Sequence, residues 1–165
     1  MFVINESCLF VKKELFRFLV GFDEDLYAFG EDGYDFCWRT WKIGYRVLYY
    51  PQVSYHKFSG FSRSPELREG TLRNLSWDLS NILLIYFKNS DLFAAMSIPL
   101  IFIKNFINSI YMGLPSAFPK MLSLFFLRLS LFNKKRIIVK LTQKVSDLKI
   151  YNHISNQGKF SKNSR

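Results

Sequence analysis

The pattern of apolar and polar positions divides the chain into two unlike halves. In the first half, residues 2–11 and 45–50 are rich in β-branched and aromatic residues, a composition typical of strands. Residues 53–57 form a third, shorter segment of this kind. Pro51 ends the second strand, because proline has no N–H to give to a sheet. These segments predict strands in the N-terminal half.

Two helices are expected between these strands. Residues 12–19 predict a short helix, and Gly21 supplies the backbone freedom for a turn directly after it. Residues 32–43 predict a second helix, since Asp32 suits its N-cap and Gly44 stands where helices commonly end. Strands and helices together predict an α/β fold.

The second half predicts long helices and a polar end. Residues 66–88 carry a broad apolar stripe at helical spacing. Three apolar runs follow, at residues 92–103, 106–118 and 121–132. A helix needs about 20 apolar residues to cross a bilayer, and no run reaches that length without a charge. Amphipathic helices that lie on a membrane surface are therefore expected. Residues 155–165 are polar and are expected to be disordered.

The net charge of +10 is concentrated in the second half. Residues 1–60 contain seven basic and eight acidic residues, whereas residues 61–165 contain sixteen basic and five acidic ones. Cations beside or within the apolar runs, such as Lys104, Lys120 and Arg128, suit an anionic membrane face. Peripheral attachment to the cytoplasmic face of a membrane is therefore expected.

Length and cysteine content set further bounds. A chain of 165 residues can bury a core of ordinary size without a metal or disulfide framework. Cys8 and Cys37 show neither C-x-x-C nor zinc spacing, which favours buried thiols in a reducing compartment. The segment that begins at Met1 lacks a basic region followed by a long apolar run, so no signal peptide is expected.

Residues 21–57 carry the chemically informative pattern, GFDEDLYAFGEDGYDFCWRTWKIGYRVLYYPQVSYHK. They combine an acidic turn, a second acidic pair, an arginine on a helix, and the stretch G-Y-R-V-x-Y-x-P followed by a histidine. This order resembles the acceptor-side half of family 2 glycosyltransferases, the inverting GT-A enzymes that include rhamnosyltransferases. The resemblance covers roughly residues 3–90. The matching positions are Gly21, Phe22, Asp23, Glu24, Glu31, Asp32, Asp35, Arg39, Gly44, Tyr45, Arg46, Val47, Tyr49, Pro51, His56, Arg73 and Asn74.

The resemblance implies an architecture and a reaction. It implies part of a GT-A fold over residues 1–90, a helical, membrane-apposed tail over residues 91–154 and a disordered end over residues 155–165. The implied enzyme is a hexosyltransferase that moves a sugar from a nucleotide sugar to a hydroxyl acceptor, lipid-linked or in a cell-surface polysaccharide. Mg²⁺ or Mn²⁺ is the implied cofactor. The family's donor-binding half and its D-x-D motif are absent from these 165 residues, so a truncated or split form, a separate donor-binding partner and little activity alone are expected.

The resemblance also assigns roles to residues. Sugar transfer needs a carboxylate that takes the proton from the acceptor hydroxyl. Asp32 is the expected base, while Glu31 either orients the acceptor or is simply solvated. The other assignments are to the acceptor or substrate (Asp35, Trp38, Arg39, Arg73) and to the metal or diphosphate (His56).

The second acidic pair can be aligned in two ways. The family has one residue between the E-D pair and the next Asp, whereas Gly33 and Tyr34 both intervene here. Aligned from the left, Asp32 is the base and Gly33 absorbs a bulge at the start of the helix. Aligned backwards from Arg39, Gly33 takes the catalytic position and the base is lost. The first alignment is preferred.

Simpler interpretations stand beside these assignments. Asp35 and Arg39 are spaced i, i+4, which equally suits an ordinary ion pair on a helix. Trp38 and Trp41 suit a core or the wall of an acceptor groove, and His56 taken alone favours a structural role. Two rival functions are a non-catalytic docking subunit and a basic membrane-binding module. No nucleic-acid partner is expected, because the sequence has no helix-turn-helix, zinc or RNA-binding motif.

Overall fold

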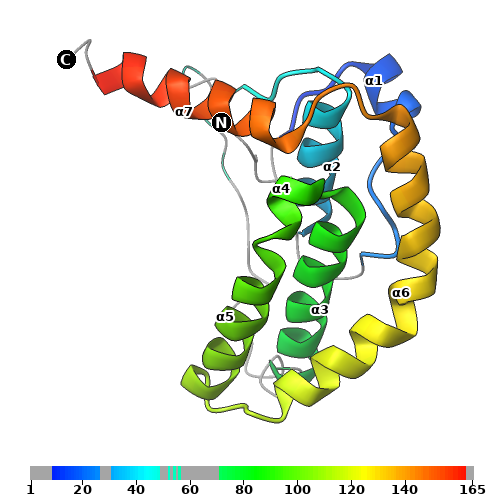
Figure 1. Cartoon of the computed structure of the whole chain (residues 1–165), viewed down its shortest axis with the longest axis vertical. Helices are drawn as coiled ribbons and strands as arrows, with labels where there is room; N and C mark the ends of the chain where they lie inside the picture. The colour runs from blue at the N-terminus through cyan, green and yellow to red at the C-terminus, as the bar shows by residue number, and fades with distance from the viewer. Residues whose placement is uncertain are drawn as a thin grey trace.

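The described part of the chain is a helical bundle. The computed structural model describes residues 9–26, 31–48, 52, 54, 56 and 71–162, and within them it contains helices and no strand. The helices are α1 (Lys13–Phe18), α2 (Glu31–Lys42), α3 (Thr71–Asn89), α4 (Leu92–Ala95), α5 (Ile98–Tyr111), α6 (Ala117–Thr142) and α7 (Asp147–Lys162) (Figure 1).

The prediction of an α/β fold, as part of a GT-A domain, is wrong, because the described residues are all-helical. Residues 45–48, within the second expected strand, have no regular structure. A strand must pair its backbone N–H and C=O groups with a neighbouring strand, and the described segments offer none. The strand expected over residues 2–11 lies mostly outside the described residues, and the one over 53–57 lies largely outside them.

The helices expected over residues 12–19, 32–43 and 66–88 are confirmed. α1 and α2 lie within one residue of their expected bounds, and α3 ends one residue beyond its own. Gly21 and Gly44 have φ of 68° and 93°, values that favour glycine, so both turns lie where expected. Asp32 does not cap α2, because the helix already begins at Glu31. The expected start of α3, residues 66–70, lies outside the described part.

The apolar runs of the second half form different helices from those expected. The first two runs become α4 and α5, which end near Gly113, and the third continues through the basic stretch into the 26-residue α6. α7 extends through residue 162, so it includes most of the polar segment expected to be disordered.

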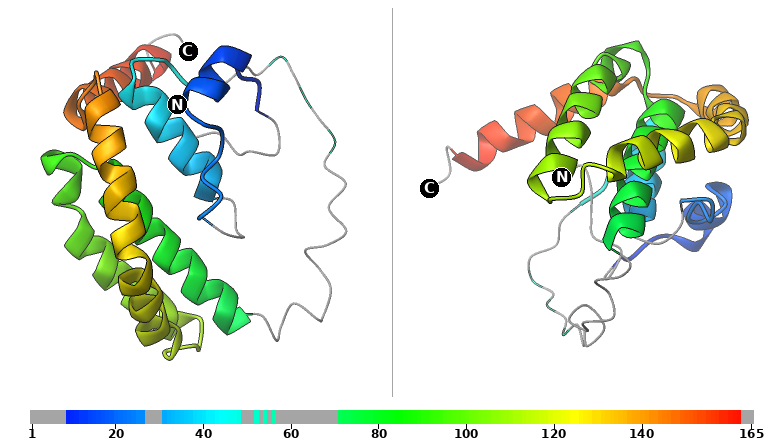
Figure 2. Two further views of the ribbon diagram at one scale, coloured as in Figure 1. Left: turned by 90° about the vertical axis from the view of Figure 1, so that its right-hand side faces the viewer. Right: turned by 90° about the horizontal axis from the view of Figure 1, so that it is seen from below.

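α3 lies at the centre of the bundle. α2 and α6 run in the same direction as α3, while α5 runs in the opposite direction (Figures 1 and 2). One apolar core joins the first half of the chain to the second, with members from the turn after α1, from α2, from α3 and from α6: Leu26, Trp38, Leu75, Leu79, Leu83, Leu84, Ile85, Ala117, Met121, Phe125 and Phe132. The segments 1–90 and 91–154 therefore share a core.

α7 crosses one end of the bundle. It packs Ile150 against Cys37, Trp41 and Val47, so the expected burial of the Cys37 thiol is confirmed, whereas Cys8 lies outside the described residues. The buried Lys42 carbonyl oxygen accepts the N–H groups of the two residues at the turn before α7, at 2.8 and 2.9 Å.

Core substitution provides a stability test. Phe132 is fully buried between α3 and α6, so Phe132→Ala is expected to lower the free energy of unfolding by about 3–5 kcal/mol. Leu127→Ala, on the same helix but exposed, is expected to change it by no more than about 0.5 kcal/mol. Chemical denaturation followed by circular dichroism measures both. Equal losses in the two variants would contradict the packing of α6 on α3.

Candidate functional site

The first turn of α2 places Glu31 against α3. Glu31 and Asp32 begin the helix, and Glu31 interacts with Asp78 and Asn81 of α3. The Asn81 side chain donates a hydrogen bond to the Glu31 carboxylate. Among the described residues, Glu31 Oε2 and Asp78 Oδ1 are buried and have no hydrogen-bond partner. Glu31 is therefore half-buried and partly paired, not simply solvated.

Burial makes the carboxylates of Glu31 and Asp78 unusually basic. It is the main cause that raises the pKa of Glu31 to about 7, and the nearby negative charge of Asp78 adds to the effect. Burial also raises the pKa of Asp78 to about 6. Near neutral pH, Glu31 therefore exists in both protonation states. This property suits a group that accepts a proton in one step and returns it later.

Arg128 of α6 orients Asn81, the residue that hydrogen-bonds Glu31. Its Nη1 donates to Asn81 Oδ1 at 2.8 Å, which leaves the amide N–H groups of Asn81 to face the Glu31 carboxylate. The same guanidinium hydrogen-bonds the backbone carbonyl of Asp25 and lies 4.8 Å from the centre of the Trp77 ring. Asn81 of α3, itself held by Arg128 of α6, thus fixes one carboxylate oxygen of Glu31 on α2.

Asp32 has a different environment. Its Oδ1 accepts the N–H of the adjacent Gly33 at 3.0 Å, and the side chain is half-buried. α2 is helical through Gly33, so the extra residue is one more helical residue instead of a bulge. As a result Glu31 and Asp35, one turn apart, both face α3.

Asp35 and Arg39 form the expected i, i+4 ion pair, with Arg39 Nε 2.7 Å from Asp35 Oδ2. The pair is buried, since Asp35 has no exposed surface. The other carboxylate oxygen of Asp35, Oδ1, lies 2.6 Å from Lys88 Nζ and accepts a hydrogen bond from Asn89 Nδ2 at 2.7 Å. Arg39 also donates to the carbonyl oxygens at positions 19 and 21, at 2.6 and 2.9 Å. These two candidates hold α2, α3 and the turn after α1 together.

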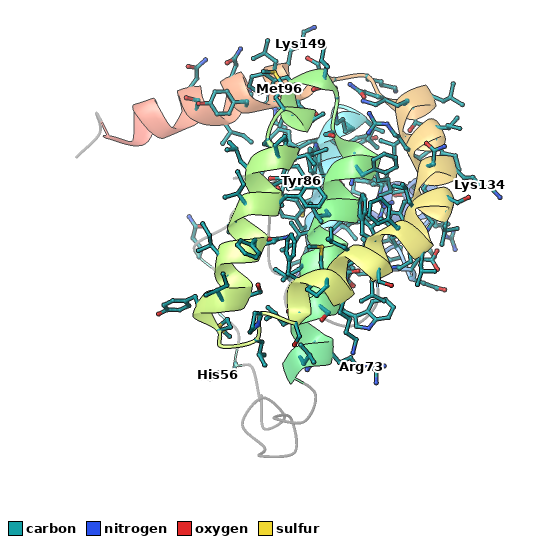
Figure 3. The ribbon with its side chains drawn as sticks, turned by 60° about the horizontal axis from the view of Figure 1, so that its bottom comes forward. His56, Arg73, Tyr86, Met96, Lys134 and Lys149 are labelled. Carbon is teal, nitrogen blue, oxygen red and sulfur yellow. The ribbon has the colours of Figure 1, made fainter. Side chains whose placement is uncertain are left out.

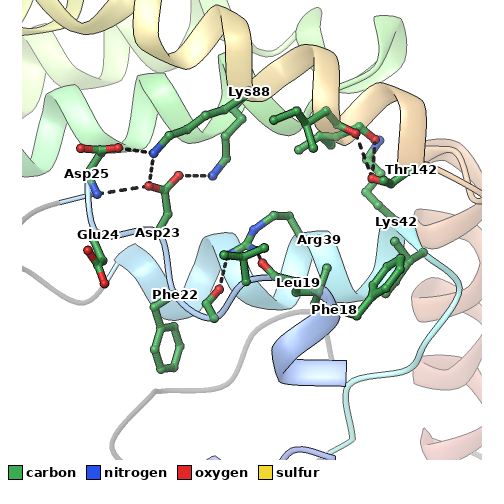
Figure 4. Close-up of a pocket in the computed structure, with 16 residues that line it drawn as sticks. Phe18, Leu19, Phe22, Asp23, Glu24, Asp25, Arg39, Lys42, Lys88 and Thr142 are labelled. Carbon is green, nitrogen blue, oxygen red and sulfur yellow. Dashed lines mark hydrogen bonds and ion pairs between the residues drawn. The ribbon is translucent and has the colours of Figure 1, made fainter. Parts of the chain in front are cut away.

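The acidic turn, residues 23–25, is paired with lysines. Asp23 lies 2.6 Å from Lys88, and Lys135 of α6 bonds both Asp23 and Asp25 (Figure 4). Burial alone would raise the pKa of Asp23, but the charges and hydrogen bonds of Lys88 and Lys135 outweigh it and lower the pKa to about 2. The turn forms one wall of a pocket of about 470 Å³ that extends to α6 and does not include Glu31.

The remaining candidates are separated. Trp38 is 3% exposed and donates from Nε1 to Asp147 Oδ1 at 2.8 Å, so it and Trp41, at 5%, belong to the interior. His56 and Arg73 are exposed and lie at the end of the molecule where α3 begins (Figure 3). Sequence reasoning missed Asp78, whose signal is that it is the single acidic residue of α3.

The described residues do not fit the implied divalent cation. In the described part of the chain, no three His, Cys, Asp or Glu side chains come together in a group that could hold a metal ion. The carboxylates of the acidic turn already bind lysines, which occupy the oxygens a cation would need. Mg²⁺ or Mn²⁺ therefore stays a prediction from the resemblance.

Comparisons of the chain with protein-family models, with curated proteins and with solved structures found no match. The glycosyltransferase resemblance thus depends on the motif residues themselves.

The proton affinity of Glu31 can be measured directly. In a carbon-13 NMR titration of labelled glutamate, Glu31 is expected to titrate near pH 7, and Asp78→Asn is expected to lower that midpoint by removing a negative charge. Because the folded-state pKa is raised, the stability linked to Glu31 is fully present below about pH 4.5 and is lost as the pH rises through about 7.

Glu31→Gln is therefore expected to stabilise the protein at pH 8 by about 1 kcal/mol, less than the full shift implies because Glu31 is only half-buried. Glu14→Gln, at an exposed position on α1, is the matched control and is expected to have no such effect. A Glu31 midpoint near pH 4.5 would refute the assignment.

Proposed function

We propose that the chain is the acceptor-side component of an inverting glycosyltransferase, in which Glu31 takes the proton of the acceptor hydroxyl. The observation that carries the proposal is the carboxylate pair of Glu31 and Asp78 at the start of α2. The order of motif residues over 21–57 supplies the reaction class, and the pair supplies a group suited to the step that this class requires.

Glu31 fits the role of general base better than Asp32. A base is most effective when its pKa lies near the working pH, and the pKa of Glu31 is about 7. Its buried Oε2 has no hydrogen-bond partner among the described residues, so a lone pair of this oxygen is free to accept a hydroxyl proton once the acceptor reaches it. Asn81 holds the carboxylate in place while Oε2 stays available.

The proposed step is a single displacement. The acceptor hydroxyl oxygen forms a bond to the anomeric carbon of the sugar, and the bond from that carbon to the diphosphate breaks. The leaving nucleoside diphosphate carries the electron pair, and the hydroxyl proton passes to Glu31 Oε2. Because attack and departure occur on opposite faces, the configuration inverts.

Asp78 acts as a positioning residue. Its negative charge disfavours a second charge on Glu31 and thereby keeps the Glu31 carboxylate basic. Asp35 and Arg39 contribute indirectly, since their buried ion pair fixes α2 against α3. The donor-binding part of the reaction is not among these 165 residues, so the proposal requires a donor-binding half, in the same chain or in a partner.

The experiment is to coexpress the chain with the polypeptide encoded directly upstream of its Met1 codon. Release of nucleoside diphosphate is then measured from a set of nucleotide sugars in the presence of extracted membrane lipids. Turnover is expected from the combination, and little from the chain alone. Glu31→Gln is expected to lower kcat by about 10²–10⁴, whereas the control Glu14→Gln leaves it unchanged.

Two further variants test whether Glu31 or Asp32 is the base, and whether Asp78 sets the pKa of Glu31. Asp78→Asn is expected to shift the acidic limb of the kcat/KM profile to lower pH, in step with the pKa of Glu31. Asp32→Asn is expected to reduce kcat less than Glu31→Gln. A combination that consumes no nucleotide sugar would refute the proposed function, and loss of activity in Asp32→Asn with Glu31→Gln intact would return the role of base to Asp32.

A further inference from the structure

We propose that α4 and α5 dock on the surface of an anionic membrane through one exposed apolar face, with the helices lying in the interface and not crossing it. The α4–α5 face consists of Leu92, Met96, Leu100, Ile103, Ile107 and Ile110. This inference is independent of the sugar-transfer proposal, because it concerns another surface and is tested by binding.

The α4–α5 face has two parts. In α5, Leu100, Ile103, Ile107 and Ile110 recur every three or four positions, the spacing that aligns side chains along a helix, while Leu92 lies in α4 and Met96 directly follows it. They are well exposed, from 53% for Ile110 to 84% for Leu92. Side chains project from α5 on the side away from α3 (Figure 3).

The opposite side of α5 is mostly apolar, since Ile98, Ile101 and Phe102 pack against the main core beside the buried Asn105 and Ser109. A helix with apolar residues on both sides needs an apolar environment on both sides, and the described bundle supplies one of them.

The attachment of α5 to the bundle favours an interfacial position. Asn105 is buried and donates from Nδ2 to the Leu79 carbonyl oxygen of α3 at 3.3 Å. The Phe106 and Phe118 rings lie 5.2 Å apart and join α5 to α6. A crossing helix would have to leave these contacts.

Length points the same way. The stretch Leu92–Tyr111 has 20 residues and a mean hydropathy of 1.4, which by composition alone would suffice to cross a membrane. It is divided, however, between α4 and the 14-residue α5, and Pro99 lies in the first turn of α5. At 1.5 Å per residue α5 extends about 21 Å, less than the roughly 30 Å of a hydrocarbon core.

Charge identifies the occupant. From residue 92 to residue 146 the sequence contains no Asp or Glu and eight Lys or Arg, of which Arg128 and Lys135 interact inside the bundle with Asn81, Asp23 and Asp25. Lys104 is exposed on α5 itself, where its long side chain can reach lipid phosphates while its methylenes stay in the apolar layer. A second copy of the chain, with its own charge of +10, would be repelled. Anionic lipid is the partner that is both apolar and negative.

The test is flotation of the purified chain with vesicles. Binding is expected to vesicles that contain about 30 mol% phosphatidylglycerol, to weaken between about 0.1 M and about 0.5 M salt, and to be much weaker with phosphatidylcholine alone. Ile103→Glu with Ile107→Glu is expected to lower the partition coefficient at least about tenfold. Lys104→Gln is expected to lower it about fivefold.

The matched control is Phe10→Glu with Leu48→Glu, which adds the same two charges at exposed positions outside the face and is expected to bind nearly as well as the native chain after allowance for its net charge. Circular dichroism checks that both double variants stay folded. Equal loss in the two double variants, or no binding of the native chain to anionic vesicles, would overturn the proposal. Capture of a protein by the native face without vesicle binding would overturn it in favour of a protein partner.

Discussion

The buried carboxylate of Asp35 is the interaction on which the arrangement of the first half depends. A charged group without exposed surface is costly unless its oxygens are paired, and Asp35 is paired by Arg39 on its own helix and by Lys88 and Asn89 of α3. These partners fix the position of α2 along α3 and the face that α2 turns toward it. Arg39 extends the constraint to the turn after α1 through two backbone carbonyls, and Lys88 extends it to Asp23.

The alignment of α2 on α3 determines the proton affinity of Glu31, because it sets this residue beside Asp78. Glu31 precedes Asp35 by one turn, so fixing Asp35 beside Asn89 also sets Glu31 beside Asp78 and Asn81. Lowered exposure and a neighbouring negative charge then raise the pKa of Glu31 to the range useful for proton transfer. α3 also carries α5 on another side, so one central helix positions both the proposed base and the proposed membrane face.

Local signals predicted the local structure. Helical spacing and Gly44 predicted α2, Gly21 predicted the turn, and the i, i+4 spacing of Asp35 and Arg39 predicted their ion pair. Burial of that pair was not predictable, because it depends on a lysine 53 positions away in the sequence. The strand prediction failed for a related reason, since strand formation depends on a neighbouring strand that composition cannot supply. Asp78 was missed because an isolated acid on a helix gives no sign of what lies opposite.

The most direct test of the account is the free energy of unfolding of Asp35→Asn, measured in guanidinium chloride beside Asp25→Asn. Asp25 lies in the acidic turn and is exposed, and it shares Lys135 with Asp23. Asp35→Asn is expected to lose about 3–5 kcal/mol, because Lys88 and Arg39 would lose the buried charge that they share. Asp25→Asn is expected to lose at most about 1 kcal/mol. A loss for Asp35→Asn no larger than that of Asp25→Asn would contradict the central role of the buried carboxylate.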